Sequence, residues 1–498
     1  MVFLVIINGL VALWLALYGL HAFVLAYLYL RHQRDTLPLP PIHRSDLPPV
    51  TVQVPVYNEL HVIERAIDAA AALDYPRDRL QIQILDDSTD ETTRLAQIRA
   101  ALYRDQGIDV TVLRRSSQDG YKAGALTSGL SQARGEYIAI FDADFCPRPD
   151  FLLQTIPHFL NRPRLGMVQT RWSYLNAAYS SLTRAQVLAL DGHFIVEQTG
   201  RNRSGLLMSF NGAGGIWRRQ CIEESGGWQA DTLCEDLDLS YRAQLAGWEF
   251  LHLPTVDVPS EVPPQITAFK RQQARWAQGS VQALRKLTKP ILQSQRLNWG
   301  QKLMAFVHLS SYLSHALLLL LLLLSPALMQ IPQAMNLPLG GLSLMCLGPP
   351  LVYTLAQQAL YPNWLRRCRA FPLLALIGIG ITWQNTRAVG RGLTRWGGTF
   401  ARTPKFRIEG ETGDWTASRY RLRADGSTVG EIGLALYALI GAGLAHVAGN
   451  YGMIPFLLLY AVAFGTVAGL GLTQTFRRRG TLPTPLQPGR LLREQHDP

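Results

Sequence analysis

The sequence predicts an α/β domain with a mainly parallel, Rossmann-like sheet, joined to an α-helical membrane domain. Two observations carry this prediction. Short apolar runs alternate with amphipathic stretches over residues 51–172, a pattern typical of a doubly wound sheet. Long apolar runs occupy residues 1–30 and recur beyond residue 303, and about twenty apolar residues suffice to span a bilayer. At 498 residues the chain is also too long for one compact domain.

Charge and cysteine content narrow the functional class. The formal net charge is +12, but much of the excess arginine flanks the apolar runs, as the positive-inside rule predicts for cytoplasmic loops. The sequence has no basic stripe interleaved with aromatic residues, so we expect no nucleic-acid partner. The five cysteines lack paired spacing, which fits a reducing compartment and argues against a disulfide framework or a zinc site.

The first element is the apolar run over residues 2–30, which ends in the basic segment 31–34. The run is too long for a signal-peptide core, and no small-residue cleavage site follows it. It therefore predicts an uncleaved anchor over residues 1–34, with its basic end in the cytoplasm. A proline-rich link leads from the anchor to the α/β domain, which we place at residues 50–262.

Five apolar runs predict the strands of this domain, at residues 51–57, 81–86, 109–114, 137–142 and 166–172. Amphipathic patterns between the strands predict helices, among them residues 59–73 and 122–134. Residues 174–204 predict an irregular helical excursion. This order of strands and helices indicates a mainly parallel sheet.

Polar residues follow three of the strands, and they are Asn58, Glu59, Asp86, Asp87, Asp142 and Asp144. The carboxyl ends of parallel strands form the edge where open α/β sheets bind ligands, so we expect a nucleotide there. Asp142 and Asp144 are two residues apart in an extended segment, so both carboxylates project together. Two carboxylates suit Mg²⁺ or Mn²⁺, which usually keeps a substrate phosphate as a further ligand. The alternative is a pair of acids on a solvated turn.

Lys122 opens a helix pattern in the glycine-flanked segment G-Y-K-A-G-A. A lysine at a helix N-terminus suits a phosphate group, and the alternative is a solvated surface lysine. The sequence has neither a Walker A motif nor G-x-G-x-x-G, so it indicates neither an ATPase nor a dinucleotide-dependent enzyme.

Three later segments could complete a site. The glycine cluster at 209–217 allows close backbone approach to a ligand, or forms only a tight turn. Glu235, Asp236 and Asp238 begin a helix pattern, where the helix dipole alone would favour them, although one could act as a general base. In the basic segment 268–286, Arg275 can pair with a diphosphate and Trp276 can stack on a sugar. This segment could also lie on anionic lipid headgroups.

Apolar runs beyond residue 303 predict four further spans, over residues 303–328, 339–360, 431–447 and 453–472. The run 371–383 is short for a span and typical of an interfacial or re-entrant segment. Leaving it out keeps the arginines of 387–407 and 477–479 on the cytoplasmic side. We therefore predict five spans in a multi-pass membrane protein with a cytosolic catalytic domain. After residue 262 the segments would be interface helices (263–300), two spans (301–362), an interfacial helix and loop (370–410), two spans (430–474) and a basic cytosolic tail (475–498).

Six spaced motifs together resemble the membrane-embedded inverting glycosyltransferases of family 2, the group of cellulose, hyaluronan and chitin synthases. The motifs are V-P-V-Y-N-E at 54–59, D-D-S-T-D at 86–90, Y-K-A-G-A-L at 121–126, D-A-D at 142–144, C-E-D at 234–236 and Q-Q-A-R-W at 272–276. Within the group, the segments I-A-I-F-D-A-D-F, F-N-G-A-G-G-I-W-R and E-D-L-D-L are most similar to cellulose-synthase-like A proteins, the mannan and glucomannan synthases. The likeness covers roughly residues 50–290 well and implies a GT-A-type fold.

The resemblance implies a role for each matching residue. Asp236 would be the catalytic base, and Asp142 and Asp144 would hold the metal, Mg²⁺ or Mn²⁺. The implied nucleotide-sugar-binding residues are Tyr57, Glu59, Asp86, Asp87, Lys122, Asp142, Gln272, Arg275 and Lys405. The implied acceptor-binding residues are Asn211, Gly212 and Trp276. Residues 400–405 resemble the gating loop F-x-V-T-x-K of the family, which closes over bound nucleotide.

The implied function is transfer of a hexose from UDP-glucose or GDP-mannose to a growing β-linked polysaccharide, which the membrane domain would extrude. The alternative is a single transfer to a lipid such as diacylglycerol or ceramide. A non-catalytic scaffold would be marked by degenerate acids, and all the motif acids are intact. Cys234 replaces a threonine of the family, and Arg402 and Pro404 alter the gating loop. These departures leave processivity open, and no protein partner is indicated.

Overall fold

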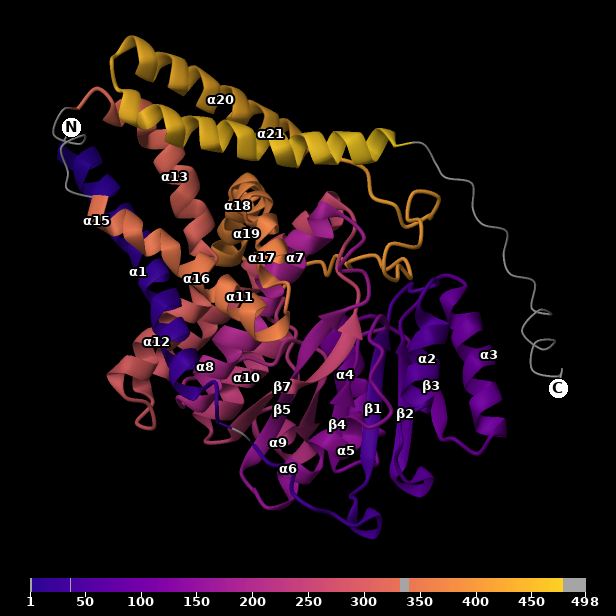
Figure 1. The fold of residues 1–498 in the computed structure, drawn as a ribbon. Helices are drawn as coiled ribbons and strands as arrows, with labels where there is room; N and C mark the ends of the chain where they lie inside the picture. The colour runs from indigo at the N-terminus through magenta and orange to yellow at the C-terminus, as the bar shows by residue number, and fades with distance from the viewer. Residues whose placement is uncertain (1, 36, 332–339, 478–498) are drawn as a thin grey trace.

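The computed structural model describes residues 2–35, 37–331 and 340–477, and most of the expected basic tail (475–498) lies outside them. The seven-stranded sheet and its helices form one part of the molecule, and the long apolar helices form the other (Figure 1). The sheet has the strand order β3-β2-β1-β4-β6-β5-β7. Its strands are β1 (Val50–Val56), β2 (Leu80–Asp86), β3 (Val110–Arg114), β4 (Tyr137–Ile140), β5 (Leu165–Tyr174), β6 (Gly215–Arg218) and β7 (Glu249–Ser260).

The predicted mainly parallel sheet is confirmed. Strand pairs β1–β2, β1–β4, β2–β3 and β5–β7 are parallel, and only β6 runs antiparallel to its neighbours. All five expected strands are present. The sequence reading missed β6, which has only four residues, and β7, in which Pro254 and Pro259 interrupt the alternating pattern.

Helices cover both faces of the sheet, because alternate residues of a strand point to opposite sides. In β4, Tyr137 and Ala139 pack in the core that includes α2, whereas Ile138 and Ile140 pack in the core that includes α4. The helices of this part are α2 (Ile63–Ala71), α3 (Thr92–Asp105), α4 (Tyr121–Ser131), α5 (Phe151–Thr155), α6 (Pro157–Leu160), α9 (Arg219–Glu224) and α10 (Glu235–Leu245), with 3₁₀ turns η1 (Arg44–Asp46) and η2 (Arg77–Arg79).

The expected irregular excursion after β5 consists of α7 (Ser181–Asp191), a π-helix labelled η3 (Gly192–Glu197) and α8 (Gln198–Arg203). The basic segment forms the long helix α11 (Ile266–Gln293). Helix α11 runs from the sheet to the apolar helices (Figure 1), so it connects the two parts of the molecule.

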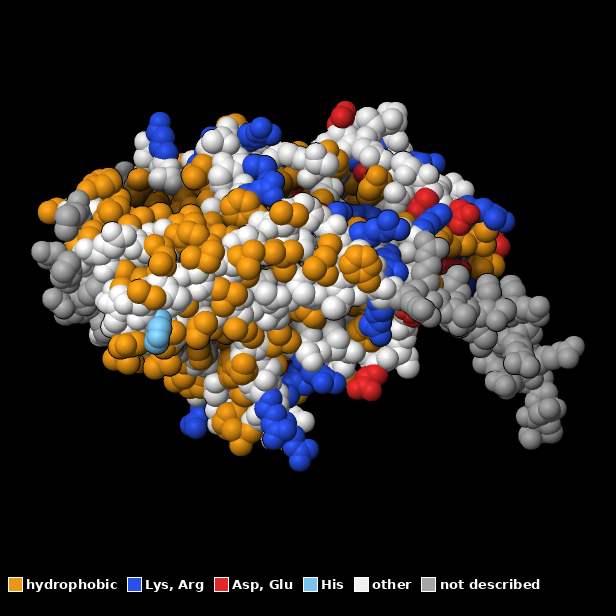
Figure 2. All heavy atoms as spheres, turned by 90° about the horizontal axis from the view of Figure 1, so that it is seen from above, with side chains coloured by type: hydrophobic (Ala, Val, Ile, Leu, Met, Phe, Trp, Pro, Cys, Tyr) orange, Lys and Arg blue, Asp and Glu red, His pale blue; other side chains and the backbone are white. Residues whose placement is uncertain are grey.

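Three helical segments among the described residues are long and apolar enough to cross a membrane, or up to four if a bent pair counts as one span. The three are α1 (Val2–His32), α20 (Ser427–Val447) and the segment Tyr451–Phe476, which comprises η6 (Tyr451–Met453) and α21 (Ile454–Phe476). α20 exposes large apolar side chains such as Val429 and Ile440, and α21 exposes Val462. Figure 2 shows this apolar face with lysines and arginines at its margins.

Two of the expected spans are not single helices. The span expected at 303–328 is a bent pair, α12 (Trp299–Leu309) and α13 (Leu313–Leu328), which meet at an angle of 64°. The Tyr18 hydroxyl donates to the Ser310 carbonyl at 2.6 Å, which satisfies backbone at the break.

The span expected at 339–360 is divided into α15 (Gly340–Ser343), η4 (Leu344–Leu347) and α16 (Gly348–Leu360), and residue 339 lies outside the described residues. Pro349 and Pro350 explain the last division, because proline suits the first turn of a helix and breaks a helix interior.

The segment expected to be interfacial contains α17 (Trp364–Arg367), η5 (Cys368–Ala370), α18 (Phe371–Gly380) and α19 (Thr382–Thr394). A loop from residue 395 then returns to the carboxyl edge of the sheet before α20 begins. This return brings residues 400–405 to the same cavity as the strand-end acids.

Candidate active site

A cavity at the carboxyl edge of the sheet contains nearly all the residues implied by the resemblance. Those that line it are Tyr57, Glu59, Asp87, Lys122, Asp142, Asp144, Asn211, Gly212, Asp236, Gln272, Arg275, Trp276 and Lys405. Asp86 is the exception among them. It is buried and accepts hydrogen bonds from the Ser88 amide at 2.9 Å and the Thr93 hydroxyl at 2.6 Å. Asp86 therefore fixes the loop after β2, whereas Asp87 faces the cavity.

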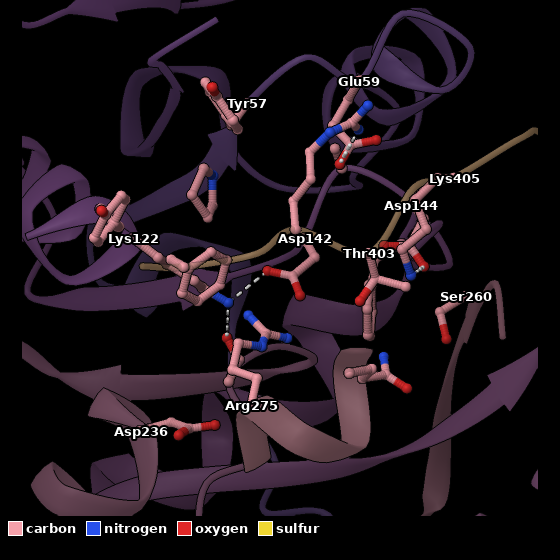
Figure 3. Close-up of a pocket in the computed structure, with 18 of the residues that line it drawn as sticks. Tyr57, Glu59, Lys122, Asp142, Asp144, Asp236, Ser260, Arg275, Thr403 and Lys405 are labelled. Carbon is pink, nitrogen blue, oxygen red and sulfur yellow. Dashed lines mark hydrogen bonds and ion pairs between the residues drawn. The ribbon is translucent and has the colours of Figure 1, made fainter. Parts of the chain in front are cut away.

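The two acids of the D-A-D motif follow β4, and each is paired with a lysine (Figure 3). Lys122 Nζ lies 2.6 Å from Asp142 Oδ1, and Lys405 Nζ lies 2.7 Å from Asp144 Oδ2. The Glu261 amide also donates to Asp144 Oδ2 at 2.9 Å. The lysines thus neutralise two carboxylates that would otherwise repel each other at a partly buried site.

Lys122 lies at the start of α4, next to Gly120 and Tyr121, which both have positive φ angles. Its ammonium donates to the Gly212 carbonyl at 2.9 Å as well as to Asp142. Burial acts to lower the pKa of Lys122, but the nearby negative charges of Asp142 and Glu235 outweigh it and hold the pKa above its ordinary value. Lys122 therefore stays positively charged, as a diphosphate ligand requires.

Asp236 lies in the first turn of α10, and the Leu237 amide donates to its Oδ1 at 2.8 Å. Burial, together with repulsion from Glu235, raises the pKa of Asp236 to about 7. Gly212 packs directly on this carboxylate, since a Cβ at Gly212 would lie 2.9 Å from Asp236 Oδ2. A carboxylate with a pKa near neutrality at the wall of a cavity is suited to general base catalysis.

Helix α11 contributes Gln272, Arg275 and Trp276 to the cavity. The Arg275 guanidinium lies 4.1 Å from the centre of the Phe400 ring, and Phe400 stacks on Tyr121 at 6.1 Å. Arg275 adds a permanent positive charge to the cavity that Lys122 also lines.

The loop at 400–405 lies in the cavity and contacts two of its acids. Besides the Lys405–Asp144 pair, Arg402 Nη1 lies 3.2 Å from Glu59 Oε1. Burial raises the pKa of Glu59 to about 8, even though Arg402 and Lys405 act to lower it. Arg402 is one of the two departures from the gating-loop pattern named above, and this contact depends on it.

The acids suit a divalent cation that binds together with a phosphate. Among the described residues no cluster of three or more His, Cys, Asp or Glu side chains is suited to metal binding. Mg²⁺ and Mn²⁺ sites of the expected kind need only one or two carboxylates, because substrate phosphates and water complete the shell. Asp142 and Asp144 each keep one carboxylate oxygen outside the lysine ion pair, so the residues present fit such an ion.

Several cavity residues were not named from the sequence, among them Glu261 and Gln118. Glu261 directly follows β7 and lines the cavity. Because β7 was not predicted, Glu261 was not recognised as an acid at a strand end. Gln118 lies just before α4 and donates to the Asp87 carbonyl at 2.7 Å. The only sequence signal for Gln118 was its place two residues before the glycine-flanked segment that contains Lys122.

Comparison with known proteins shows the family of this chain. The family described as glycosyltransferase-like family 2 matches residues 48–279. A probable glucomannan 4-beta-mannosyltransferase 2 of Oryza sativa subsp. japonica is 33% identical over 455 residues, covering 88% of this chain and 76% of the relative. This chain belongs to glycosyltransferase family 2.

Other similarities are more local. Glucomannan 4-beta-mannosyltransferase 2 of Arabidopsis thaliana is 42% identical over 262 residues, covering 52% of this chain and 49% of the relative. For several curated relatives the match spans about half of their length. A mannosyltransferase from Pyrobaculum calidifontis, solved with GDP-mannose and Mn²⁺, superposes with a TM-score of 0.50 at 22% identity, over 78% of this chain and 99% of that one. That likeness shows a shared GT-A-like fold.

Proposed function

We propose that this protein is a metal-dependent, inverting β-glycosyltransferase that adds hexose units from a nucleotide sugar to a β-linked polysaccharide. One observation carries the proposal: a base of suitable pKa, Asp236, lines the same cavity as the cationic and acidic groups expected to hold a nucleotide diphosphate. The family assignment and the glucomannan mannosyltransferase relatives support it.

The groups of the cavity divide the chemistry between them. Asp236 would remove the proton from the attacking acceptor hydroxyl. Lys122 and Arg275 would stabilise the negative charge that develops on the leaving diphosphate. A cation held by Asp142 and Asp144 would supply further electrostatic stabilisation of that diphosphate. Direct displacement of an α-linked leaving group inverts the anomeric carbon and gives a β-linkage.

We propose GDP-mannose as the first donor to test and UDP-glucose as the second. The named relatives act as mannosyltransferases, and the structural neighbour was solved with GDP-mannose. Asn211, Gly212 and Trp276 are proposed to contact the acceptor, and Tyr57, Glu59 and Asp87 the nucleotide.

We further propose that the apolar helices make the protein multi-pass, with the catalytic domain in the cytosol. Several helix ends meet on the side away from the sheet: Leu4 and Val5 of α1 pack near Leu328 of α13, and Asn450, before α21, donates to the Met329 carbonyl. At the other end, Gln474 accepts from the Ile266 amide at the start of α11. The broken segment 340–360 would make the return passage between these two ends.

Incubating the purified full-length protein in lipid nanodiscs with labelled GDP-mannose or UDP-glucose tests the function. We expect a ladder of β-linked products from one donor, dependent on Mg²⁺ or Mn²⁺. A single monohexosyl lipid would establish the glycolipid alternative in its place. Absence of both transfer and donor hydrolysis, at wild-type folding, would refute the enzymatic function.

A further inference from the structure

A chain of polar side chains lies behind Asn211, the residue expected to contact the acceptor. Gln198 Nε2 donates to Asn211 Oδ1 at 2.7 Å, and Asn211 Nδ2 lies 2.9 Å from His193 Nε2. His193 Nδ1 in turn lies 2.9 Å from Glu197 Oε2. Gln198, Asn211, His193 and Glu197 thus form one connected chain of hydrogen bonds, and Asn211, in its middle, lines the cavity.

The two ends of this chain fix the direction of every hydrogen bond within it. Gln198 Nε2 also donates to the Ser209 carbonyl at 2.7 Å, and a carbonyl can only accept. The Asn211 oxygen must therefore face Gln198, and the Asn211 nitrogen must donate to His193 Nε2. His193 then carries its proton on Nδ1 and donates it to Glu197.

Glu197 is suited to hold this tautomer. Burial opposes its ionisation, but the interaction with His193 and then the positive charge of Arg201 outweigh burial and lower the pKa of Glu197 below its ordinary value. An ionised carboxylate accepts only, so it selects the Nδ1-protonated imidazole. That tautomer leaves Nε2 as an acceptor for the Asn211 amide.

Packing holds His193 and Glu197 firmly at this place. Both lie in the π-helix η3, a type of helix that often occurs at functional sites. A Cβ at Gly192 would lie 2.5 Å from the Tyr353 ring, so η3 packs tightly on α16. Arg201 of α8 contacts His21 of α1 at 2.7 Å, which ties the following turn to the first apolar helix.

Asn211 connects this chain of hydrogen-bonded side chains to the neighbourhood of the base, Asp236. Asn211 precedes Gly212, whose Cα packs on the Asp236 carboxylate and whose carbonyl accepts from Lys122. The Asn211 amide keeps one N–H and one oxygen lone pair beyond the bonds described above. Asn211 and Asp236 line the same cavity, so these remaining positions are available to a ligand that also approaches Asp236.

We propose that His193, held by Glu197, is a positioning residue that orients the Asn211 amide so that it binds the acceptor sugar for attack. This role rests on the proposed function. A misoriented amide would leave the donor site intact but would hold the acceptor poorly. Water would then compete better for the donor sugar, so hydrolysis would gain relative to transfer.

The test compares two variants of His193 in the full-length protein. His193→Leu keeps the size of the side chain but removes the acceptor, whereas His193→Gln places an amide oxygen near the former Nε2 position. With the active donor, we expect the ratio of transfer to donor hydrolysis to fall about tenfold in His193→Leu and to recover to within about threefold of wild type in His193→Gln. Binding of the nucleoside diphosphate should stay within about twofold in both.

A second variant and a control keep the test decisive. In Glu197→Gln the imidazole can adopt the other tautomer, so the ratio should fall about threefold even if His193→Leu does not fold. His158→Leu removes a buried histidine outside the cavity and should leave the ratio unchanged.

Two outcomes separate this inference from the function on which it rests. A wild-type protein that transfers sugar, with an unchanged ratio in His193→Leu or Glu197→Gln, would refute the role of His193 alone. A wild-type protein that transfers no sugar at all would refute the proposed function as well.

Discussion

Asp236 is the residue whose surroundings bear most directly on the proposed chemistry. Its carboxylate is buried beside Glu235, and these two causes raise its pKa to about 7. Lys122 and Arg275 limit the rise, because their positive charges favour the ionised form. The result is a carboxylate that changes protonation state within the physiological range.

The first prediction concerns pH. A general base works only when deprotonated, so transfer should rise as pH increases through about 7 and should fall about tenfold per pH unit well below it. The measurement is kcat/KM for the donor against pH, with folding monitored at each pH. A profile that stays flat from about pH 5 to pH 8 would remove Asp236 from the role of base.

The second prediction concerns removal of the base. Asp236→Asn should lower transfer by about 10²–10⁴-fold, because the amide cannot accept the proton. Nucleotide affinity, measured by calorimetry, should change little, and lost nucleotide binding would contradict the assignment. Asp231→Asn is the matched control, since Asp231 pairs with Lys286 at 2.8 Å and does not line the cavity.

Most of the residues named from the sequence line one cavity, and their roles there stay predictions. Asp86 and Asp87 show the limit of reasoning from the sequence. Consecutive residues at a strand end project to opposite sides, so only one of two adjacent acids can face the cavity. The sequence pair D-D does not say which one, and the structure selects Asp87 because Asp86 is held by Ser88 and Thr93.

At the scale of elements, the loop that contains Gly212 joins the base to the rest of the site. Gly212 has a φ angle of +86°, a conformation that other residues adopt with strain. A Cβ here would also contact Asp236 Oδ2. The close approach of this loop to α10 therefore requires glycine for two separate reasons.

The third prediction separates the two reasons for glycine at position 212. Gly212→Ala should lower stability by about 1–3 kcal/mol through backbone strain and should also abolish most transfer, because Asp236 must move. Gly227→Ala is the matched control: Gly227 has a φ angle of +68°, but a Cβ there meets nothing within 4 Å. Thermal unfolding should respond to both variants and transfer mainly to Gly212→Ala. Equal losses of transfer would show that strain alone is responsible.

The fourth prediction concerns the attachment of α11 to the apolar helices. Lys270 of α11 and Glu431 of α20 form a fully buried ion pair with an N–O distance of 2.6 Å. Lys270→Met should cost about 3–5 kcal/mol, because it leaves the buried Glu431 carboxylate without its cation. Glu431→Leu should cost less, because Lys270 keeps Asp425 at 3.9 Å, and the double variant should recover much of the loss. Thermal unfolding of the four proteins in detergent measures this coupling. If the stability losses of the two single variants simply add in the double variant, Lys270 and Glu431 are not coupled.

Sequence patterns predicted elements best where an apolar run was long or ended sharply. The five expected strands have these features. β6 and β7 do not, because β6 is short and β7 contains prolines and a register shift in its pairing with β5. Both strands are held by their neighbours in the sheet, which is information that a local pattern does not contain.

At the scale of the whole molecule, the described ends of the apolar helices fall into two groups. One group lies near the sheet and the other lies on the far side, as the contacts of Asn450 and Gln474 indicate. Sequence hydropathy predicted the apolar segments, but it did not predict that segments 303–328 and 339–360 would be broken. Those breaks depend on local partners, such as Tyr18 for Ser310, and on Pro349 and Pro350.

The fifth prediction concerns topology. If the segment 340–360 makes a return passage, a tag at the C-terminus should lie on the same side of the membrane as the catalytic domain. Protease digestion of sealed vesicles, with a second tag inserted in the exposed turn between α3 and β3 as the cytosolic reference, measures this arrangement. If one tag is protected and the other is cleaved, the chain after the sheet crosses the membrane an odd number of times. The proposed return passage would then be wrong.

The loop with Arg402 and Lys405 has a consequence for the order in which the protein is synthesised and folds. These cations form ion pairs with Glu59 and Asp144. Both acids are synthesised some hundreds of residues before their partners, and before most of the apolar segments. The ribosome must therefore deliver nearly the whole polypeptide, and the bilayer must receive it, before the acids gain their counter-charges. A nascent or truncated product that ends after α11 would expose uncompensated carboxylates, so catalytic competence would follow membrane insertion in time.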